Sequence, residues 1–497
     1  MTENATKTVI REKDFGIWNE YSWADYGDMA RLVGLGLLSL GLRRGDVCSI
    51  ASEVNKEWMF SDLGIICAGG VTNGVYPTDA PNQVEYLITD SDTRFYFAED
   101  EEQLDKVLEV RDRTPSLEKV FIFDMEGLRQ LDDPMCMSFE QLLELGRDYA
   151  ATHGNRWRVE IEAANPDDLM VLTFTSGTTG PPKGAMITQQ NMMFMMQCLQ
   201  RCYGIHPNDE QLGFLPLAHV AGRMFYTFSL IESRAVINLV ESPETVVRDL
   251  QEVEPTIHFA VPRVWEKQFS TVAIKLKEAT WLGRVAYELG LKIGQRRAAY
   301  LKTLARVPLY LKCAFFVFDN LVFRNIRRAL GIDKCRWLST AAAPIAPDLI
   351  DWYWSIGKPM YEVYGHTECT GIATANLIDD FRIGSVGKAI DDVEVRVVTP
   401  DGAECPAGQP GEVVVRGYNV MVGYLDDPNQ TAEAIDAEGW LHTGDIGVMD
   451  ADGYLDITDR VKDMFINGGF NVYPAEVERL MLAHPEVGQV AVVGLPD

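Results

Sequence analysis

Short apolar runs alternate with longer helix-like segments through the first quarter of the chain. The runs VCSIAS (47–52), RFYFAED (94–100) and KVFIFD (119–124) are rich in β-branched and aromatic residues, and helix-like stretches cover 56–68 and 101–110. This alternation is typical of parallel sheets that are covered by helices. We therefore predict an α/β fold for this region.

The pattern continues through the middle of the chain and then changes. LGFLPLA (212–218), TIHFAVP (256–262) and CRWLST (335–340) continue the series of strands, whereas the later runs VEVRVV, GEVVVRG and GYLDI lie between Gly, Pro and Asp turns. Short strands between tight turns are typical of antiparallel sheets. We predict a large domain of parallel-rich α/β sheets over residues 1–461, with a β-rich subdomain over about 384–458.

Two segments predict individual helices. Ser22 opens the capping-box motif SWAD, and the apolar-rich run that follows ends at Gly41, which predicts a helix between them. A second apolar segment, 307–323, contains Lys312 and Asp319 and is too polar for a membrane span. We expect an ordinary buried helix there, and the alternative is a helix that rests on a membrane while it collects a lipid acid.

The composition is that of a globular protein with a strongly acidic balance. Among 497 residues, 47% are hydrophobic and 24% are charged, and 45 Lys or Arg stand against 73 Asp or Glu, a formal net charge of −28. This charge repels the phosphates of nucleic acids and anionic membranes, so neither is an expected partner. An anionic small ligand needs local cations, a metal ion or backbone N–H groups.

The N-terminal sequence, MTENATKTVIREKDFG, lacks the apolar run of a signal peptide. We therefore expect a cytoplasmic protein without stable membrane insertion, either a monomer or a homodimer.

The segment TFTSGTTGPPKGA (173–185) is the best candidate for an anion site. It overlaps MVLTF (170–174), which reads as a buried strand, and ligands of parallel α/β sheets bind at the carboxyl ends of strands. The glycines allow a ligand to approach the backbone, the hydroxyls donate hydrogen bonds, and Lys183 supplies a positive charge. These features predict a phosphate-binding loop.

A Walker A loop is an alternative that the segment does not fit. That motif places Gly before its Lys, whereas Pro182 stands there and Gly184 follows Lys183. Two consecutive prolines also lack the N–H groups that bind phosphate. A general P-loop ATPase is therefore the least favoured function, and a flexible surface hairpin is the other interpretation of the segment.

Four motifs in order resemble those of the adenylate-forming (ANL) superfamily, which includes acyl-CoA synthetases, luciferases and peptide-synthetase adenylation domains. They are TSGTTGPPKG (175–184), YGHTE (364–368), HTGD (442–445) and DRVKDMFINGGFNVYPAEVE (459–478). The resemblance runs from about residue 20 to the end of the chain. The segments FLPLAHVAGR, FAVPRVWEK and FRNIRRALG are most similar to acyl-CoA ligases for long-chain or bulky acids.

The resemblance implies a site for ATP and Mg²⁺ that is spread over these motifs. The loop from Thr175 to Lys183 would hold the β- and γ-phosphates, and Thr367 would reach the α-phosphate. Glu368 would bind Mg²⁺, which favours carboxylate and phosphate oxygens. The implied catalytic residues are Lys183, Thr367, Glu368, Arg460 and His219.

The resemblance also implies the nucleoside contacts. The backbone of Ala342–Pro344 and the ring of Tyr364 would enclose adenine, Asp445 would accept hydrogen bonds from the ribose, and Arg460 would contact the ribose or the phosphates. The full implied nucleotide set is Thr175, Ser176, Gly177, Thr178, Thr179, Gly180, Lys183, Ala342, Ala343, Pro344, Glu362, Val363, Tyr364, Gly365, Thr367, Asp445 and Arg460.

On the acid side, the resemblance implies acyl contacts from His219, Ala341 and Gly365. A histidine satisfied within the core is the other interpretation of His219. Ala341 stands where the family has glycine in its Ser-Gly-Ala-Ala-Pro turn, which predicts an altered acid pocket. The run NMMFMMQ (191–197) is favoured as core packing over a pliable acyl tunnel.

Relatives continue after a hinge into a small mobile α+β domain. Lys462 matches the hinge, and Gly468 and Gly469 match a loop that lines the tunnel for CoA. We predict that residues 462–497 begin this domain and that the sequence is an incomplete copy, because the family's late Ser-Gly-Lys lysine is absent.

The leading hypothesis is an ATP- and Mg²⁺-dependent ligase that adenylates a bulky apolar acid, fatty or polycyclic, and then forms a CoA thioester. A stand-alone enzyme that makes only acyl-AMP, for a separate ligase or carrier protein, is the alternative among enzymes. A catalytically idle nucleotide- or acyl-binding protein is the alternative from another class.

Overall fold

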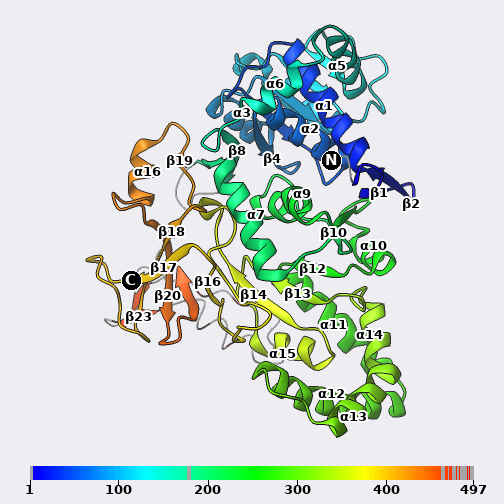
Figure 1. The fold of residues 1–497 in the computed structure, drawn as a ribbon, viewed down its shortest axis with the longest axis vertical. Coiled ribbons are helices and arrows are strands. Elements are labelled where there is room, and N and C mark those ends of the chain that lie inside the picture. Colours follow the sequence, from blue (N-terminus) through cyan, green and yellow to red (C-terminus); the bar gives the residue numbers. More distant parts are fainter. Residues whose placement is uncertain are drawn as a thin grey trace. The chain divides into compact units, whose positions relative to one another are not determined.

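The computed structural model of the chain describes two compact units (Figure 1). The described residues are 4–175, 181–460, 465–467, 470–472, 477, 481, 490 and 492. The first unit consists of Met1–Gln200, Ile205–Asp249 and Met421–Thr431. The second consists of Arg201–Gly204, Leu250–Val420 and Ala432–Asp497.

A large mixed sheet dominates the first unit. Its order among the described residues is β19-β9-β8-β4-β3-β5-β6-β7. The strands are β3 (Val47–Ala51), β4 (Val71–Val75), β5 (Phe95–Ala98), β6 (Lys119–Ile122), β7 (Cys136–Ser138), β8 (Leu169–Thr175), β9 (Lys183–Thr188) and β19 (Gly423–Tyr424). The pairs from β8 to β7 are parallel, and β9 and β19 join in antiparallel register. The predicted parallel-rich α/β fold is confirmed.

Helices connect these strands. They are α1 (Trp23–Ser39), α2 (Lys56–Cys67), α3 (Pro81–Asp90), α4 (Glu101–Val110), α5 (Phe139–His153), α6 (Arg156–Glu162) and α7 (Gln189–Tyr203). The start of α1 shows why the sequence folds in this way: Ser22 Oγ accepts from the Asp25 N–H at 3.2 Å, and the Asp25 carboxylate accepts from the Ser22 N–H at 2.8 Å. This reciprocal capping box confirms the helix predicted from SWAD.

A smaller sheet of order β10-β11-β1-β2 completes the first unit. Its strands are β1 (Thr8–Asp14), β2 (Ile17–Ser22), β10 (Glu210–Gly213) and β11 (Val236–Leu239). Short helical segments lie between β10 and β11 in sequence: α8 (Val220–Gly222), the π-helical turn Arg223–Phe228 and α9 (Ser229–Ser233); α10 (Val246–Val253) follows β11. A buried ion pair between Lys13 and Asp249, 2.8 Å long, fixes β1.

The second unit contains a sheet of order β12-β13-β14-β15-β16. Its strands are β12 (Ile257–Ala260), β13 (Trp337–Thr340), β14 (Met360–Tyr364), β15 (Thr374–Ala375) and β16 (Lys388–Ala389). The helices of this unit are α11 (Pro262–Glu278), α12 (Trp281–Lys302), α13 (Leu309–Phe318), α14 (Arg324–Ala329) and α15 (Pro347–Ser355). A π-helical turn, Asp319–Phe323, joins α13 to α14.

An antiparallel sheet, β17-β18-β20-β21, follows in the second unit. Its strands are β17 (Val393–Val398), β18 (Pro410–Gly417), β20 (Leu441–Met449) and β21 (Leu455–Arg460). The β-rich, antiparallel section predicted beyond residue 384 is confirmed. The helix α16 (Pro428–Ala434) precedes β20, and a hairpin of β22 (Phe465–Asn467) and β23 (Phe470–Val472) lies beyond residue 460. Most of the predicted small C-terminal domain lies outside the described residues, and its bounds stay a prediction.

The apolar segment 307–323 differs from its prediction as an ordinary buried helix. Leu311 and Phe315 are buried, but Leu309, Phe316 and Leu321 are exposed, because only one side of α13 packs on its own unit. Within the described part of the chain, no helix combines the length and apolarity required to cross a membrane.

Candidate active site

The predicted phosphate loop connects two antiparallel strands of the first unit. β8 and β9 pair so that Thr175 lies opposite Lys183 and Phe174 opposite Gly184. β8 is also parallel to β4, so its carboxyl end lies at the sheet edge where ligands bind in α/β folds. Ser176, Gly177, Thr178, Thr179 and Gly180 lie outside the described residues, and their phosphate contacts stay a prediction.

Lys183 is held by neutral groups. Its ammonium donates to the amide oxygen of Gln430 and lies 5.1 Å from the ring centroid of Tyr424. No carboxylate pairs with it among the residues that the structure describes. Beside it, the Tyr86 hydroxyl donates to the Pro182 carbonyl at 2.9 Å, which fixes the backbone of the residue before Lys183. The lysine charge is therefore positioned and remains available to an anion. We call the β8–β9 hairpin with Lys183 the phosphate region.

A polar cluster at the end of β14 joins two of the predicted motifs in the second unit. The Tyr364 hydroxyl donates to Asp445 Oδ2 at 2.9 Å, and His366 Nε2 lies 2.7 Å from the phenol oxygen and 3.0 Å from Asp445 Oδ2. Because the single phenol proton goes to Asp445, His366 Nε2 is the donor in both of its contacts. Burial, together with the Asp445 charge, raises the pKa of Tyr364 far above its ordinary value, which keeps the phenol protonated.

The backbone also fixes Asp445, which lies in β20. Its N–H donates to Thr443 Oγ1 at 3.1 Å, and the Thr443 hydroxyl donates to the Val413 carbonyl at 2.7 Å. Arg460 is the Cα partner of Asp445 in the β20–β21 register. The strand pairing thus places both predicted ribose-side residues at one position of the sheet, while the Arg460 side chain lies outside what the structure describes.

A tight 3₁₀ turn, Thr367–Cys369, carries Thr367 and Glu368 and is separated from the end of β14 by two residues. A Cβ on Gly365 would lie 2.3 Å from the Gly371 carbonyl oxygen, so this close approach requires glycine. Thr370 closes the turn with φ +53°, and its hydroxyl donates to the Asn419 carbonyl at 2.7 Å. Glu368 therefore projects from a rigid turn that begins three residues after Tyr364. We call this turn, with Tyr364, His366 and Asp445, the nucleoside region.

Glu362 and Val363, predicted in the nucleotide set, are buried in β14. Glu362 Oε2 accepts from the Gly384 N–H at 3.0 Å. Burial, with a smaller contribution from the Asp456 charge, raises the pKa of Glu362 to about 8. The Glu362 side chain is thus a protonated structural group, and a nucleotide contact from it stays a prediction.

The loop Ala341–Pro344 follows β13; it contains the predicted adenine contacts, Ala342–Pro344, and the predicted acyl contact Ala341. Ala342, Ala343 and Pro344 are exposed, so their backbone groups are accessible. Ala342 has φ +74°, a left-handed conformation that costs a non-glycine residue about 1 kcal/mol. Strain of this kind concentrates at functional positions, which supports the prediction for this loop.

His219 is the N-cap of α8 and is exposed, so the interpretation of a buried core histidine is wrong. Its Nδ1 accepts from the Ala221 N–H at 3.0 Å, which places the proton of the neutral ring on Nε2. Desolvation by the surrounding protein lowers the pKa of His219.

The sequence analysis missed two residues of the neighbouring structure, Arg223 and Asp62. Arg223 donates to Asp62, and this fully buried ion pair anchors the segment after His219.

The methionine run behaves as core. Met192 and Met196 of α7 pack with Ile66, Met170 and Phe228 in a buried cluster of the first unit, so the favoured core interpretation is confirmed for these two side chains. The hinge residue Lys462 and the CoA-tunnel residues Gly468 and Gly469 lie outside the described residues, and their roles stay predictions.

His366 is the residue of the nucleoside region that the sequence analysis left out, although it stands inside the motif YGHTE. Its imidazole orients both Tyr364 and Asp445. Only the position of a histidine within the motif signals this role in the sequence, because nothing local identifies a partner 79 residues away in β20.

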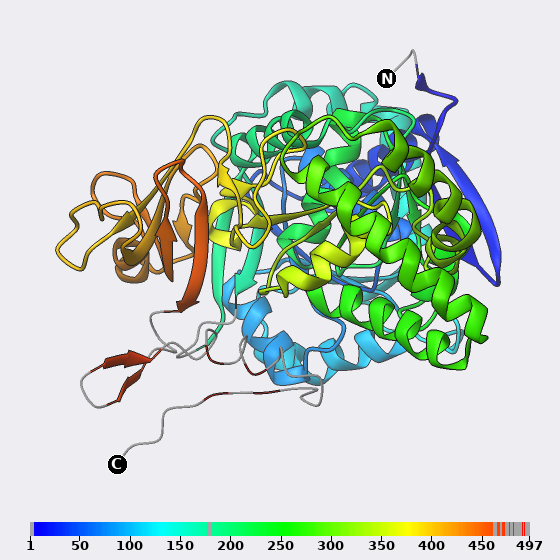
Figure 2. The ribbon, with the colours of Figure 1, turned by 90° about the horizontal axis from the view of Figure 1, so that it is seen from below.

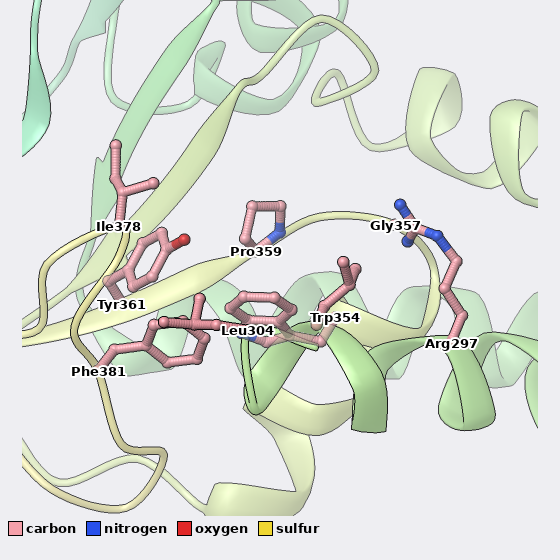
Figure 3. Close-up of a pocket in the computed structure, with 9 residues that line it drawn as sticks. Arg297, Leu304, Trp354, Gly357, Pro359, Tyr361, Ile378 and Phe381 are labelled. Carbon is pink, nitrogen blue, oxygen red and sulfur yellow. The ribbon is translucent and has the colours of Figure 1, made fainter. Parts of the chain in front are cut away.

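A cavity of about 260 Å³ in the second unit is lined by none of the predicted site residues. Figure 3 shows Arg297 at one end and Ile378 at the other, with the rings of Trp354, Tyr361 and Phe381 between them. Trp354 and Phe381 stack with their ring centroids 4.9 Å apart. The cavity is therefore an aromatic pocket, and the polar groups of the nucleoside region do not line it.

Comparisons of sequence give the following likenesses. The family model described as AMP-binding enzyme matches residues 2–425. The long-chain-fatty-acid–CoA ligase ACSBG2 of Xenopus laevis is 32% identical over 486 residues, which cover 95% of this chain and 63% of that protein. The long-chain-fatty-acid–CoA ligase FadD15 of Mycobacterium bovis is 32% identical over 487 residues, 96% of this chain and 76% of its own length. The chain thus spans less than two thirds of the length of ACSBG2.

Comparisons of structure give the same fold. A crystal structure of the anthranilate CoA ligase AuaEII in complex with anthranoyl-AMP has a TM-score of 0.78 and 22% identity, covering 100% of this chain and 83% of that chain. ATP-bound MatB from Rhodopseudomonas palustris has a TM-score of 0.75 and 23% identity, with coverage of 100% and 84%. At these identities the likeness establishes the fold alone.

Proposed function

The chain belongs to the AMP-binding enzyme family, and on that premise we propose that it activates an apolar, long-chain or otherwise bulky carboxylic acid with ATP and transfers the acyl group to CoA. In the first step the acid carboxylate attacks the α-phosphate, acyl-AMP forms and pyrophosphate leaves. In the second step the CoA sulfur attacks the acyl carbon, the thiol proton is released and AMP leaves. The names of the relatives, long-chain-fatty-acid–CoA ligases, support this substrate class.

The observation that carries the proposal is the hydrogen-bonded cluster of Tyr364, His366 and Asp445. A buried carboxylate that is oriented by two donors is suited to accept hydrogen bonds from the hydroxyls of a ribose. The face of the adjacent Tyr364 ring would pack on adenine, together with the exposed backbone of Ala342 and Ala343.

Three side chains would donate to the phosphates and to the acid carboxylate. Lys183, which has no carboxylate partner in the described residues, would neutralise negative charge on the β- and γ-phosphates. The Thr367 hydroxyl would donate to the α-phosphate. His219, through Nε2–H, would hold the acid carboxylate. Together these donors would stabilise the charge that develops on both exchanging oxygens.

Glu368 would hold Mg²⁺. No group of three or more His, Cys, Asp or Glu side chains in the described chain can hold a metal alone. A single carboxylate such as that of Glu368 fits Mg²⁺ in phosphoryl-transfer enzymes, where one or two carboxylates act with the substrate phosphates. When bound, the ion would neutralise phosphate charge, while Glu368 stays on its rigid turn.

The test is ATP–pyrophosphate exchange with hexadecanoate and with a bulky ring acid, followed by CoA thioester detection. We expect acid-dependent exchange, thioester formation once CoA is added, and loss of both in Glu368→Gln. Glu404→Gln, which changes an exposed glutamate of the same unit, is the matched control. Exchange that is absent with every acid, or ATP hydrolysis that needs no acid, would overturn the proposal.

A further inference from the structure

One side of helix α12 in the second unit exposes a stripe of apolar and basic residues. We define the α12 stripe as Leu282, Leu289, Lys292, Arg296 and Tyr300. Leu282 is 69% exposed and Leu289 50%. The spacings of seven, three and four residues place the stripe on one side of a helix.

The opposite side of α12 is buried and packs on neighbouring helices of the unit. Gly290, Gly294 and Ala298 are buried, and a Cβ on Gly294 would lie 2.0 Å from the Ser355 carbonyl oxygen in α15. The helix therefore lies directly on α15 at Gly294, while Gly290 packs against Phe318 and Phe323. This contact turns the α12 stripe away from the unit to which it belongs.

Helix α13 repeats the arrangement. We define the α13 stripe as Leu309, Tyr310, Lys312, Phe316 and Val317 of α13, with Leu321 of the π-helical turn that follows it. Leu309 is 76% exposed, Phe316 70% and Leu321 65%, whereas Phe315 on the inner side is buried, with the Arg297 guanidinium 4.3 Å from its ring centroid. Exposed apolar patches of this kind mark interaction surfaces.

The two stripes belong to one hairpin. α12 and α13 pack against each other, and Figures 1 and 2 show them as neighbouring green helices. The turn between them is itself exposed at Leu304 and Arg306. We call the two stripes and this turn the α12–α13 face.

The charge around this face is opposite to that of the whole chain. Residues 262–329, which span α11 to α14, contain 14 Lys or Arg and 4 Asp or Glu, a net charge of +10 within a chain of −28. Some of this charge is offset, because Lys302 pairs with Asp351, and Arg324, Arg327 and Arg328 lie beside Asp333. In the described part of the chain, Lys292, Arg296 and Lys312 form no ion pair. Salt limits the reach of distant charges to about 10 Å, so the local excess governs what this face attracts.

We propose that the α12–α13 face docks on the surface of an anionic lipid bilayer. Leu309, Phe316 and Leu321 enter the interfacial layer, and Lys292 and Lys312 contact lipid phosphates. Amphipathic helices with apolar and basic residues bind anionic bilayers in this way. The repulsion of anionic membranes expected from the net charge is thus reversed locally. This inference does not rest on the proposed function, because binding to vesicles needs neither ATP nor acid.

Vesicle flotation tests the proposal. The full chain is mixed with vesicles of phosphatidylcholine alone or of phosphatidylcholine with phosphatidylglycerol, at low and high salt. We expect binding to the anionic vesicles that salt weakens. The variant Lys292→Gln/Arg296→Gln/Lys312→Gln lowers that binding about a hundredfold, because each basic residue near an anionic surface contributes about 1 kcal/mol.

A second variant tests the apolar contacts. Leu309→Ser/Phe316→Ser reduces binding at both salt concentrations, by about tenfold or more. The matched control, Ile17→Ser/Val247→Ser, removes two exposed apolar side chains of the first unit and leaves binding unchanged. Since all substitutions lie at exposed positions, unaltered thermal unfolding checks that each variant is folded.

Three results overturn the proposal. The first is wild-type binding to neither kind of vesicle, and the second is equal binding by all the variants. The third is self-association through this face, seen by analytical ultracentrifugation as a wild-type dimer that the Leu309→Ser/Phe316→Ser variant loses, without any vesicle binding. That result would assign the face to a second copy of the chain, whose acidic remainder also complements its charge.

Discussion

The phosphate region and the nucleoside region differ in where their polar groups find partners. In the nucleoside region, Tyr364, His366 and Asp445 bond to one another, and protein donors orient the Tyr364 oxygen and Asp445 Oδ2. In the phosphate region, Lys183 contacts a neutral amide and an aromatic ring. In the nucleoside region the polar groups have partners within the protein. In the phosphate region the lysine charge remains available to an anionic ligand.

This difference follows from burial. Asp445 and Thr367 are buried, and a buried polar group without a partner costs about 1–3 kcal/mol, so their neighbours must satisfy them before any ligand binds. Lys183 projects from a hairpin end, where solvent can satisfy it. A nucleoside site is therefore preorganised, whereas a triphosphate site relies on charge.

The largest effect is expected when the charge of the phosphate region is removed. Lys183→Met should lower acid-dependent ATP–pyrophosphate exchange by about 10²–10³-fold, because a positioned donor to developing charge is lost. Steady-state exchange kinetics measure this. Lys275→Met, at an exposed helical lysine, is the control and should retain full activity; a Lys183→Met enzyme as active as this control would contradict the assignment.

The next effect comes from the backbone of the nucleoside region. Gly365→Ala should lower the free energy of unfolding by about 2–3 kcal/mol, because its Cβ would meet the Gly371 carbonyl oxygen at 2.3 Å. Urea unfolding measures the loss. Gly283→Ala has no such contact, its nearest neighbouring atom lying 3.4 Å from the added carbon, and should be neutral. Equal stability of the two variants would show that the turn tolerates a side chain.

Glu362 makes the stability of the second unit depend on pH. Its folded pKa of about 8 lies above the ordinary value of 4.5, so the stabilising proton is retained at low pH and lost as pH rises toward 8. Glu362→Gln should therefore match the wild type below about pH 5 and exceed it by about 2 kcal/mol or more above about pH 8. Unfolding titrations at both values measure this, with Glu404→Gln as control. A difference that is the same at both pH values would contradict the buried, protonated carboxyl.

A smaller effect is expected from one hydrogen bond of the nucleoside region. Tyr364→Phe keeps the ring but removes the donor to Asp445, and should weaken AMP binding about fivefold, near 1 kcal/mol. Calorimetric titration with AMP measures the change. Tyr361→Phe alters a buried phenol three residues earlier in β14. It controls for the loss of a hydroxyl in this strand and should leave AMP affinity unchanged.

The smallest effect concerns the adenine loop. Ala342→Gly should raise the free energy of unfolding by about 0.5–1 kcal/mol, since glycine adopts φ +74° without the steric cost. Ala343→Gly lacks this gain and serves as the control. A destabilised Ala342→Gly variant would show that the loop is not strained at this position.

Much of the fold followed from local patterns. The capping box at Ser22, the short β-rich runs and the change to antiparallel turns beyond residue 384 are encoded within a few residues of each element. The exposure of α13 was not predictable in this way. Its apolar sequence is the same whether the outer side meets protein or solvent, and only the contact of Phe315 and Leu311 with their neighbours decides which side is inner.

The site divides similarly. Lys183, Tyr364 and Asp445 stand in recognisable motifs, and the structure brings Tyr364 and Asp445 into contact. Asp62 was missed because its partner Arg223 lies 161 residues away, and no short motif joins them. A charge that is buried by tertiary packing has no local signature in the sequence.

The central claim is that Asp445 serves the nucleoside and Lys183 the phosphates, and calorimetric titration of both variants with ATP and with AMP tests it most directly. We predict that Asp445→Asn weakens ATP and AMP binding alike, whereas Lys183→Met weakens ATP binding about tenfold or more and leaves AMP binding unchanged. If Lys183→Met binds ATP as the wild type does, or if Asp445→Asn loses ATP but retains AMP, the assignment is contradicted.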